Sequence, residues 1–274
     1  MPPAADQSSY DAELSIASEA ARRAGQLQME RYERLERIVH KGEHDVVTEV
    51  DELSEELILS ILREAYPDDV FLAEESGRSH VVAPNGGRSA GQPERVWIID
   101  PLDGTVNYAN GIPIFCVSIG LAVGGLPEVG VVYDPVRDEL FTAVAGRGAR
   151  LDGAPIRQPQ KDKLSDLVLA IAMPARGWSQ RERGLRRRIR VSRILGSAAL
   201  SLAYVGNGRF DGFVQAGGLS LWDVCAAGLI AAEGGAAVTT RDGGPWFDIS
   251  HASRSIGLIA AAPAHHATLL ELLA

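Results

Sequence analysis

The sequence predicts an α/β protein of 274 residues in two joined lobes, residues 1–155 and residues 156–274. Three observations favour this class. Apolar side chains recur at helical spacing near the N-terminus, short β-rich runs with tight turns follow, and strand-like and helix-like stretches alternate after about residue 155. With 46% hydrophobic and 23% charged residues, the chain has a globular composition, which excludes a largely disordered or coiled-coil protein.

The first lobe opens with two predicted helices. Residues 9–33 place apolar or small side chains on one helix face, and residues 51–65 repeat the pattern. Pro67 ends the second helix because proline cannot continue the hydrogen-bond pattern. The intervening residues 41–48 indicate a turn and a short extended piece.

Predicted strands follow. Residues 70–73 and 95–99 are short apolar runs, and the Gly-, Pro- and Ser-rich residues 77–94 between them indicate a surface loop. Three more β-rich runs are separated by turn sequences and predict an antiparallel sheet: residues 114–123, 128–133 and 139–144.

The second lobe alternates the two element types, which predicts layered α/β structure. Its expected strands are residues 167–172, 210–215, 236–239 and 256–262. Its expected helices are residues 197–206, 221–233 and 264–273.

The charge balance limits the partners. Lys+Arg 27 against Asp+Glu 36 gives a net charge of −9, which disfavours nucleic acid and anionic membranes as partners. No apolar run reaches the roughly 18 residues of a membrane span, and the first residues lack the pattern of a signal peptide. The two cysteines, Cys116 and Cys225, suit free buried thiols in a reducing compartment, so we expect a cytoplasmic protein.

Acidic residues stand where apolar segments end or begin. Glu74 and Glu75 follow one predicted strand, Asp100 and Asp103 follow another, and Asp223 precedes an apolar helical run. Taken singly, such acids are typical of solvated strand ends, turns and helix N-caps. Gathered together they would repel one another, and a hard cation such as Mg²⁺, Mn²⁺ or Ca²⁺ would relieve that repulsion. The six histidines show no zinc-type spacing.

The run Asp-Pro-Leu-Asp-Gly-Thr at residues 100–105 packs two carboxylates, a proline-fixed turn and a hydroxyl into six positions. Gly104 and Thr105 would expose backbone N–H groups at the start of a helix, where phosphate binds well. Carboxylates for a metal beside an anion site predict a phosphate-ester site.

Five stretches together resemble the inositol monophosphatase family, within the lithium-sensitive, magnesium-dependent phosphomonoesterases. They occur in the family's order at residues 41–51, 72–77, 97–108, 195–199 and 222–228. The resemblance implies a layered α-β-α-β-α sandwich, a site between the lobes, and a homodimer.

The resemblance also implies a metal set. Glu74, Asp100 and the backbone carbonyl of Leu102 would hold the metal that activates the attacking water. Asp100, Asp103 and Asp223 would hold a second metal beside the leaving group. Two or three Mg²⁺ per site are implied, with Mn²⁺ as a substitute and Li⁺ as an inhibitor.

The remaining roles are carried over in the same way. The Thr105 hydroxyl, oriented by Asp51, would position and deprotonate the water, and Glu75 would have a supporting role. Substrate contacts would come from Gly104, Thr105, Gly196, Ser197, Ala198 and Asp223, with Lys41 on a loop that completes the site.

Two features depart from the family pattern. Inositol-specific members carry an acid seven positions before the Asp of the Trp-Asp pair, where this chain has Ala216. Seven arginines lie between Arg181 and Arg193. They form either a solvated helix face or dimer rim, or a basic collar through which Arg193 contacts a second phosphate.

The sequence therefore predicts Mg²⁺-dependent hydrolysis of a small phosphate monoester, with inositol monophosphate as the leading substrate. Alternatives are fructose 1,6-bisphosphate, 3′-phosphoadenosine 5′-phosphate and histidinol phosphate. A phosphatase with a nucleophilic aspartate needs Asp-x-Asp, and Asp100 and Asp103 are one residue too far apart. A non-catalytic regulatory protein with the same fold is the remaining alternative.

Overall fold

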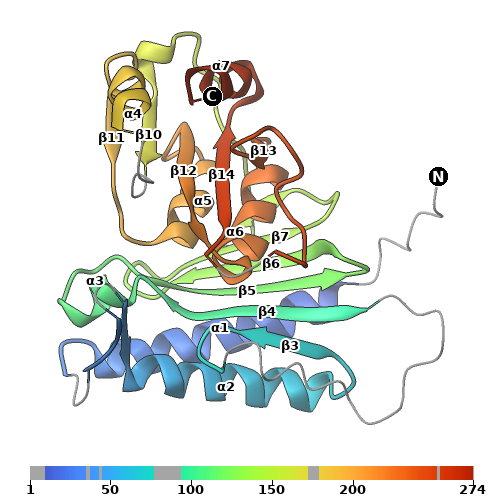
Figure 1. The fold of residues 1–274 in the computed structure, drawn as a ribbon. Helices are drawn as coiled ribbons and strands as arrows, with labels where there is room; N and C mark the ends of the chain where they lie inside the picture. The colour runs from blue at the N-terminus through green and yellow to red at the C-terminus, as the bar shows by residue number, and fades with distance from the viewer. Residues whose placement is uncertain are drawn as a thin grey trace.

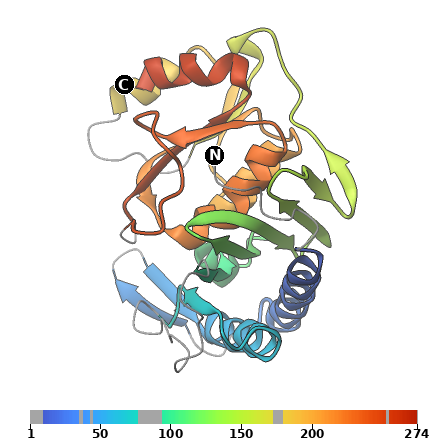
Figure 2. The same cartoon turned by 90° about the vertical axis from the view of Figure 1, so that its right-hand side faces the viewer.

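The computed structural model describes residues 10–34, 38–42, 45–76, 94–171, 179–251 and 254–273, which form five alternating layers of helices and sheets (Figure 1). One outer layer holds α1 (Asp11–Arg31) and α2 (Glu49–Ala65), the middle layer holds α5 (Ala198–Gly206) and α6 (Leu221–Glu233), and the other outer layer holds α4 (Ser179–Arg186) and α7 (Pro263–Leu273). The same order is visible from the side, with α7 in red at the top and α1 and α2 in blue at the bottom (Figure 2). The predicted α-β-α-β-α sandwich is confirmed.

A seven-stranded sheet separates the α1–α2 layer from the middle helices. It pairs β3 with β4 in parallel and every later neighbour antiparallel, as predicted for this half. In spatial order its strands are β3 (Val70–Ala73), β4 (Arg95–Asp103), β5 (Cys116–Val123), β6 (Leu126–Asp134), β7 (Glu139–Val144), β8 (Ala149–Leu151) and β9 (Ala154–Ile156). The sequence did not predict β8 and β9.

A five-stranded sheet lies on the other side of the middle helices. Strand β10 pairs in parallel with β11 and β12, and β14 pairs antiparallel with β12 and β13. In spatial order the strands are β11 (Val191–Arg193), β10 (Val168–Ile171), β12 (Gly212–Leu219), β14 (Ile256–Ala261) and β13 (Ala237–Thr240). A 3₁₀ turn, Leu164–Asp166, precedes β10, and a separate hairpin joins β1 (Ile38–Gly42) to β2 (Asp45–Thr48).

Helix α6 packs on the seven-stranded sheet through small residues. A Cβ atom on Gly130 would lie 2.6 Å from the carbonyl oxygen of Ala226, and one on Gly120 would lie 2.5 Å from the Cys225 sulfur. Both distances are shorter than real contacts, so glycine is required for this close approach. The small-residue face of α6 therefore fixes how near its first turn comes to the end of β4.

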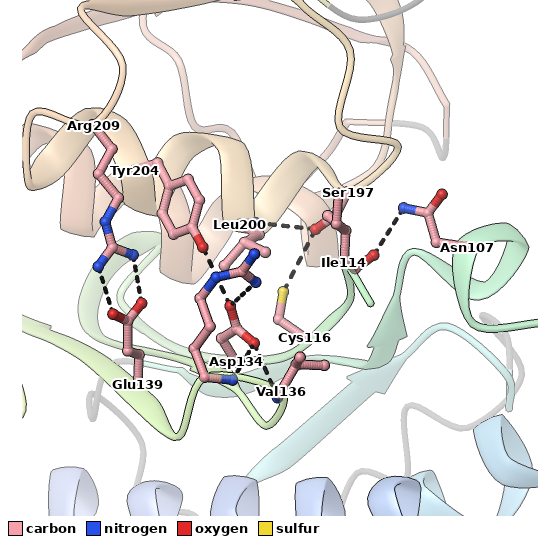
Figure 3. Close-up of polar contacts among 11 residues, drawn as sticks. Asn107, Ile114, Cys116, Asp134, Val136, Glu139, Ser197, Leu200, Tyr204 and Arg209 are labelled. Atoms are coloured by element: carbon pink, nitrogen blue, oxygen red, sulfur yellow. Dashed lines mark hydrogen bonds and ion pairs between the residues drawn. The ribbon is translucent and has the colours of Figure 1, made fainter. Parts of the chain in front are cut away.

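Helix α5 is tied to the same sheet by polar contacts at its far end. The Tyr204 hydroxyl donates to the buried carboxylate of Asp134 over 3.2 Å, and Arg209 forms an ion pair with Glu139 (Figure 3). These contacts hold the middle layer against β6 and β7, so both middle helices have a fixed position relative to β4.

Some predicted features differ in the structure, and others are not tested by it. The arginine run forms α4 and β11; the exposed arginines of α4 agree with the solvated helix face, one of the two alternatives, whereas β11 was not predicted. Most of the predicted 77–94 loop lies outside the described residues. The lobe boundary near residue 155 stays a prediction. In the part of the chain that is described, no helix combines the length and apolarity needed to cross a membrane.

Candidate active site

Three carboxylates from two layers meet at one end of the seven-stranded sheet. Asp100 and Asp103 lie on β4, Asp223 lies in the first turn of α6, and one ligand oxygen of each lies within 4.8 Å of the others. Residues three apart on a regular strand point to opposite faces. The pairing of β4 with β5 is irregular between Asp100 and Asp103, next to Pro101, and this irregularity lets both carboxylates join one cluster.

The cluster is buried and mutually repulsive. Asp100 and Asp103 are only 2% and 7% exposed. Burial and the neighbouring charges of Glu74, Asp103 and Asp223 raise the pKa of Asp100 well above its usual value. Burial, together with Asp103, raises the pKa of Asp223 to about 7. Such a set of oxygen donors fits a hard divalent cation, which would remove the repulsion.

Glu74, a predicted metal ligand, follows the neighbouring strand β3; it is not one of the three carboxylates within 4.8 Å of one another, although its charge raises the pKa of Asp100. Its backbone N–H donates to the Ile99 carbonyl over 3.2 Å, which continues the parallel pairing of β3 and β4 by one step. The buried carboxylate of Glu55 on α2 holds the turn that follows, since it accepts the backbone N–H groups of Glu75 at 2.7 Å and Ser76 at 2.8 Å.

Asp103 also binds the start of α5. Its carboxylate accepts the N–H groups of Ala199 at 2.8 Å and Ala198 at 3.2 Å, and the hydroxyl of Ser197, the N-cap residue. Cys116 Sγ lies 3.7 Å from Ser197 Oγ in the same network (Figure 3). Cys116 and Cys225 are both free and buried, as predicted. Asp103 therefore links the metal-type cluster to the turn at Gly196.

A hydroxyl and a buried carboxylate flank the cluster. Thr105 Oγ1 lies 2.9 Å from Asp51 Oδ1 and 3.0 Å from the Leu102 carbonyl oxygen, so two acceptors compete for its proton. Asp51 is 1% exposed and accepts the N–H of Thr48 at 2.8 Å within the capping box of α2. Burial raises the pKa of Asp51, while the hydrogen bonds from Thr48 and Thr105 oppose that shift.

Gly104 makes the sharp turn between β4 and the short helix α3 (Thr105–Ala109). Its φ is +100°, and a Cβ atom would lie 2.9 Å from the Ile114 carbonyl oxygen, so only glycine fits. The first N–H groups of a helix have no partner inside it. The backbone of Gly104 and Thr105 is therefore placed to bind an anion beside the carboxylates.

A cavity of about 230 Å³ opens next to Asp103 and Asp223. The turn Gly196–Ala198 forms part of its wall, and Arg193 and Gln215 also line it. Arg193 is exposed, and its guanidinium donates to the Ser192 carbonyl at 3.0 Å. Of the predicted loop residue Lys41, the structure describes the backbone, in β1, and not the side chain.

Ala216 does not occupy the position that counting from Asp223 suggests. Its side chain packs in the outer core with Val214, whereas Gln215 lines the cavity. The pairing of β12 with β14 is irregular between Gln215 and Leu219, where β12 has two more residues than the opposite stretch of β14. A fixed offset therefore selected the wrong residue, and a neutral amide faces the cavity.

Asn107 is a second connection that sequence reasoning missed. Its side-chain nitrogen donates to the Ile114 carbonyl at 2.8 Å (Figure 3) and to the Leu195 carbonyl at 2.7 Å. It therefore fastens α3 to the turn at Gly196. Asn107 stands in one of the five resembling stretches, but its spacing gave no sign of a role. For Glu55 the sequence did indicate a role, because a charged residue stands there on the apolar, buried face of α2.

Comparison with known proteins agrees with this geometry. The profile of the inositol monophosphatase family matches residues 9–274. The chain is 40% identical over 259 residues to "Nus factor SuhB" of Pasteurella multocida, covering 91% of each chain, and 37% identical over 244 residues to "Inositol monophosphatase 1" of Solanum lycopersicum, covering 86% and 87%. The crystal structure of extragenic suppressor protein suhB from Bartonella henselae superposes with a TM-score of 0.86 at 34% identity, covering 96% of this chain and 98% of that one.

The fold and its relatives indicate a phosphatase, a hydrolase of a class that is generally metal-dependent. The chain belongs to the inositol monophosphatase family.

Proposed function

We propose that this protein is a Mg²⁺-dependent phosphomonoesterase, with inositol monophosphate as its leading substrate. The observation that carries the proposal is the convergence of Asp100, Asp103 and Asp223 within 4.8 Å, beside the Thr105–Asp51 hydrogen bond and a cavity. A metal-type cluster, an anion-binding turn and a space for an alcohol are what hydrolysis of a phosphate ester requires.

The proposed metal ligands are all oxygen atoms. Glu74, Asp100 and the Leu102 carbonyl would hold one ion, and Asp100, Asp103 and Asp223 a second, with two or three ions per site. When bound, Mg²⁺ or Mn²⁺ supplies charge to the phosphoryl oxygens and acidifies water. Inhibition by Li⁺ belongs to the same proposal.

The chain's own groups orient the nucleophile and the phosphate. Because the Thr105 hydroxyl lies 2.9 Å from Asp51 Oδ1, donation in that direction leaves its lone pairs to accept a proton from the attacking water. Asp51 then takes the threonine proton, and Glu74, which follows the neighbouring strand β3, would assist. The N–H groups of Gly104 and Thr105 hold the phosphoryl oxygens.

The alcohol half of the substrate would lie in the 230 Å³ cavity, against Gly196, Ser197, Ala198 and Asp223. Lys41 and Arg193 are the candidate contacts from its mouth. Gln215 presents a neutral amide to the same space; its oxygen is buried and has no hydrogen-bond partner within the described part of the chain. A substrate hydroxyl would satisfy that oxygen.

Homodimer formation and a cytoplasmic location complete the proposal. Val106, Ile112 and Ile194 are 51%, 43% and 60% exposed, which is unusual for large apolar side chains. Val106 and Ile112 lie in or just after α3, and Ile194 precedes Leu195, whose carbonyl accepts the hydrogen bond from Asn107. Their closeness supports one apolar surface through which two copies of the chain would contact each other. Light scattering coupled to gel filtration tests the homodimer, and a monomeric mass would contradict it.

The decisive experiment compares phosphate release with Mg²⁺ from inositol 1-phosphate, fructose 1,6-bisphosphate, 3′-phosphoadenosine 5′-phosphate and histidinol phosphate. The highest kcat/KM for inositol 1-phosphate is expected, and a higher value for another ester would replace it as substrate. No turnover of any ester would favour the second candidate, a non-catalytic regulatory protein. The identity to relatives named Nus factor SuhB supports that candidate.

A further inference from the structure

A second cavity, of about 350 Å³, adjoins the one beside the carboxylates. Gly218 on β12 lines both cavities, while its neighbours Ala216 and Gly217 line the second one. Gly218 carries no side chain, so the border that the two cavities share is formed there by backbone alone. A molecule larger than the first cavity therefore has a place for its remainder.

The second cavity is lined by basic groups. Arg241 and Arg254 face it together with His251, and Asp242 is the acid among its lining residues. Asp242 is 81% exposed and lies 3.6 Å from Arg241 Nε, which is a weak, solvated pair. Arg241 is also positioned by the Ala216 carbonyl, 3.4 Å from its Nη1.

Arg254 stands in a fixed relation to the carboxylate cluster. Its backbone N–H donates to Ser220 Oγ over 2.9 Å, and Ser220 is the N-cap residue of α6, three positions before Asp223. Its φ of +58° is unusual for a residue other than glycine, and the Ser220 contact holds it there. The basic cavity and the carboxylates thus share one rigid support.

The arginines of the run between Arg181 and Arg193 lie in a different setting. Arg186 pairs with Glu182 within α4, and Arg190 pairs with Asp166 at 2.9 Å. Within the described part of this run, Arg193 lines the first cavity, at its wall next to Gly196. Two different places could therefore receive a second negative group on the substrate.

We propose that the cavity between β12 and Arg241 and Arg254 is a subsite for an anionic group on the alcohol half of the substrate. The inference rests on the proposed phosphatase function. If the subsite is present, an ester with a second phosphate or a carboxylate replaces inositol monophosphate, which has neither, as the leading substrate. The neutral Gln215 in the first cavity suits such a ligand, because a carboxylate at that place would repel it.

The test uses matched pairs of esters that differ by the second anion. Fructose 1,6-bisphosphate is compared with fructose 1-phosphate, which lacks the second phosphate, and glycerate 2-phosphate with glycerol 2-phosphate, which lacks the carboxylate. For each pair the ratio of kcat/KM, doubly anionic over singly anionic, is measured with Mg²⁺. The pair with the larger ratio identifies the preferred anion.

In Arg241→Gln we expect this ratio to fall about 10-fold, because a charge-assisted hydrogen bond is lost. Arg190→Gln is the matched control, since its ion pair with Asp166 lies outside both cavities, and its ratio should equal that of the wild type. If the ratio falls in Arg193→Gln and not in Arg241→Gln, the proposal is overturned, and the second anion binds beside Arg193 in the first cavity.

Failure of the proposed function is distinguishable from failure of the subsite. If no ester is hydrolysed, calorimetric titration of fructose 1,6-bisphosphate into wild type and Arg241→Gln measures the subsite directly. A Kd about 10-fold weaker in the variant supports the subsite without turnover. An equal Kd, or wild-type ratios in every variant, overturns it.

Discussion

The carboxylate cluster and the alcohol cavity are neighbours built in different ways. The cluster comes from two short continuous runs, residues 100–105 and 222–223, each at the end of a regular element and fixed by hydrogen bonds. The cavity wall comes from a turn at Gly196, an irregular stretch of β12 and Arg193 at the end of β11. Short sequence motifs therefore identify the residues of the carboxylate cluster. The residues that would select the substrate depend on local irregularities of the backbone, which a motif does not show.

The largest expected effect comes from the centre of the cluster. Asp100→Asn should lower kcat by about 10³-fold or more, because a shared metal ligand supplies several kcal/mol of transition-state stabilisation. The same change removes a buried charge that neighbours repel, so the metal-free variant should melt at a higher temperature than metal-free wild type. Phosphate release and differential scanning calorimetry measure the two effects. Near-normal turnover would contradict the assignment of the cluster.

A smaller loss is expected at the hydroxyl beside the cluster. Thr105→Ala should lower kcat about 100-fold, because positioned proton transfer contributes roughly that much, while Mg²⁺ affinity stays close to wild type. Thr105→Ser keeps the hydroxyl and is the matched control, which should restore most of the rate. Equal losses in both variants would mean that the threonine methyl group, and not the hydrogen bond to Asp51, matters.

The same contrast separates what could be predicted from the sequence. Strands β3 and β7 and helix α6 have the predicted bounds, because apolar periodicity ends there at turn residues or at glycine. For helix α4 the sequence offered a solvated helix face as one alternative but gave no bounds, since the helix carries one buried apolar residue, Leu185, and its position depends on packing against α7. Short strands such as β8 have too few residues to show a period.

For the site, acids at the ends of strands and the start of a helix predicted a cation site, and the family resemblance selected Asp100, Asp103 and Asp223 as one set of ligands. The irregular pairing in β12, with two extra residues between Gln215 and Leu219, was not predictable, because the register of a strand is set by its partner strand. Gln215, and not Ala216, lines the cavity beside the carboxylates. Long-range contacts such as the one from Asn107 to Leu195 are likewise set by the tertiary fold.

The link between the two regions gives a prediction of intermediate size. Asn107→Ala should raise KM about 10-fold with a smaller change in kcat, because the turn at Gly196 loses its attachment to α3 and two carbonyls lose a donor. Asn110→Ala is the matched control, since that side chain is exposed and donates only within its own turn, to Val106. Steady-state kinetics on both variants provide the measurement. A fall in kcat alone would assign Asn107 to the chemical step.

The smallest effect is on stability, and its sign follows from the raised pKa values. Asp100 and Asp223 have folded-state pKa values above those of the unfolded chain, about 7 for Asp223, so the metal-free folded state binds more protons. Its stability must therefore fall as the pH rises from about 4 towards 7 and then level off. Mg²⁺ binds the ionised carboxylates, so the increase in Tm on adding Mg²⁺ should be larger at pH 8 than at pH 5.5.

Each kcal/mol corresponds to about 2–4 °C for a chain of this size, which calorimetry resolves easily. Asp248→Asn is a suitable control, because Asp248 is a surface carboxylate whose pKa is lowered by its hydrogen bonds from Ser250, so it shifts stability with the opposite sign. A Mg²⁺ effect independent of pH would mean that the ion binds somewhere other than this cluster. Among the described residues that line the alcohol cavity, those with raised pKa values are Asp103 and Asp223 of the cluster, so this measurement reports on the cluster.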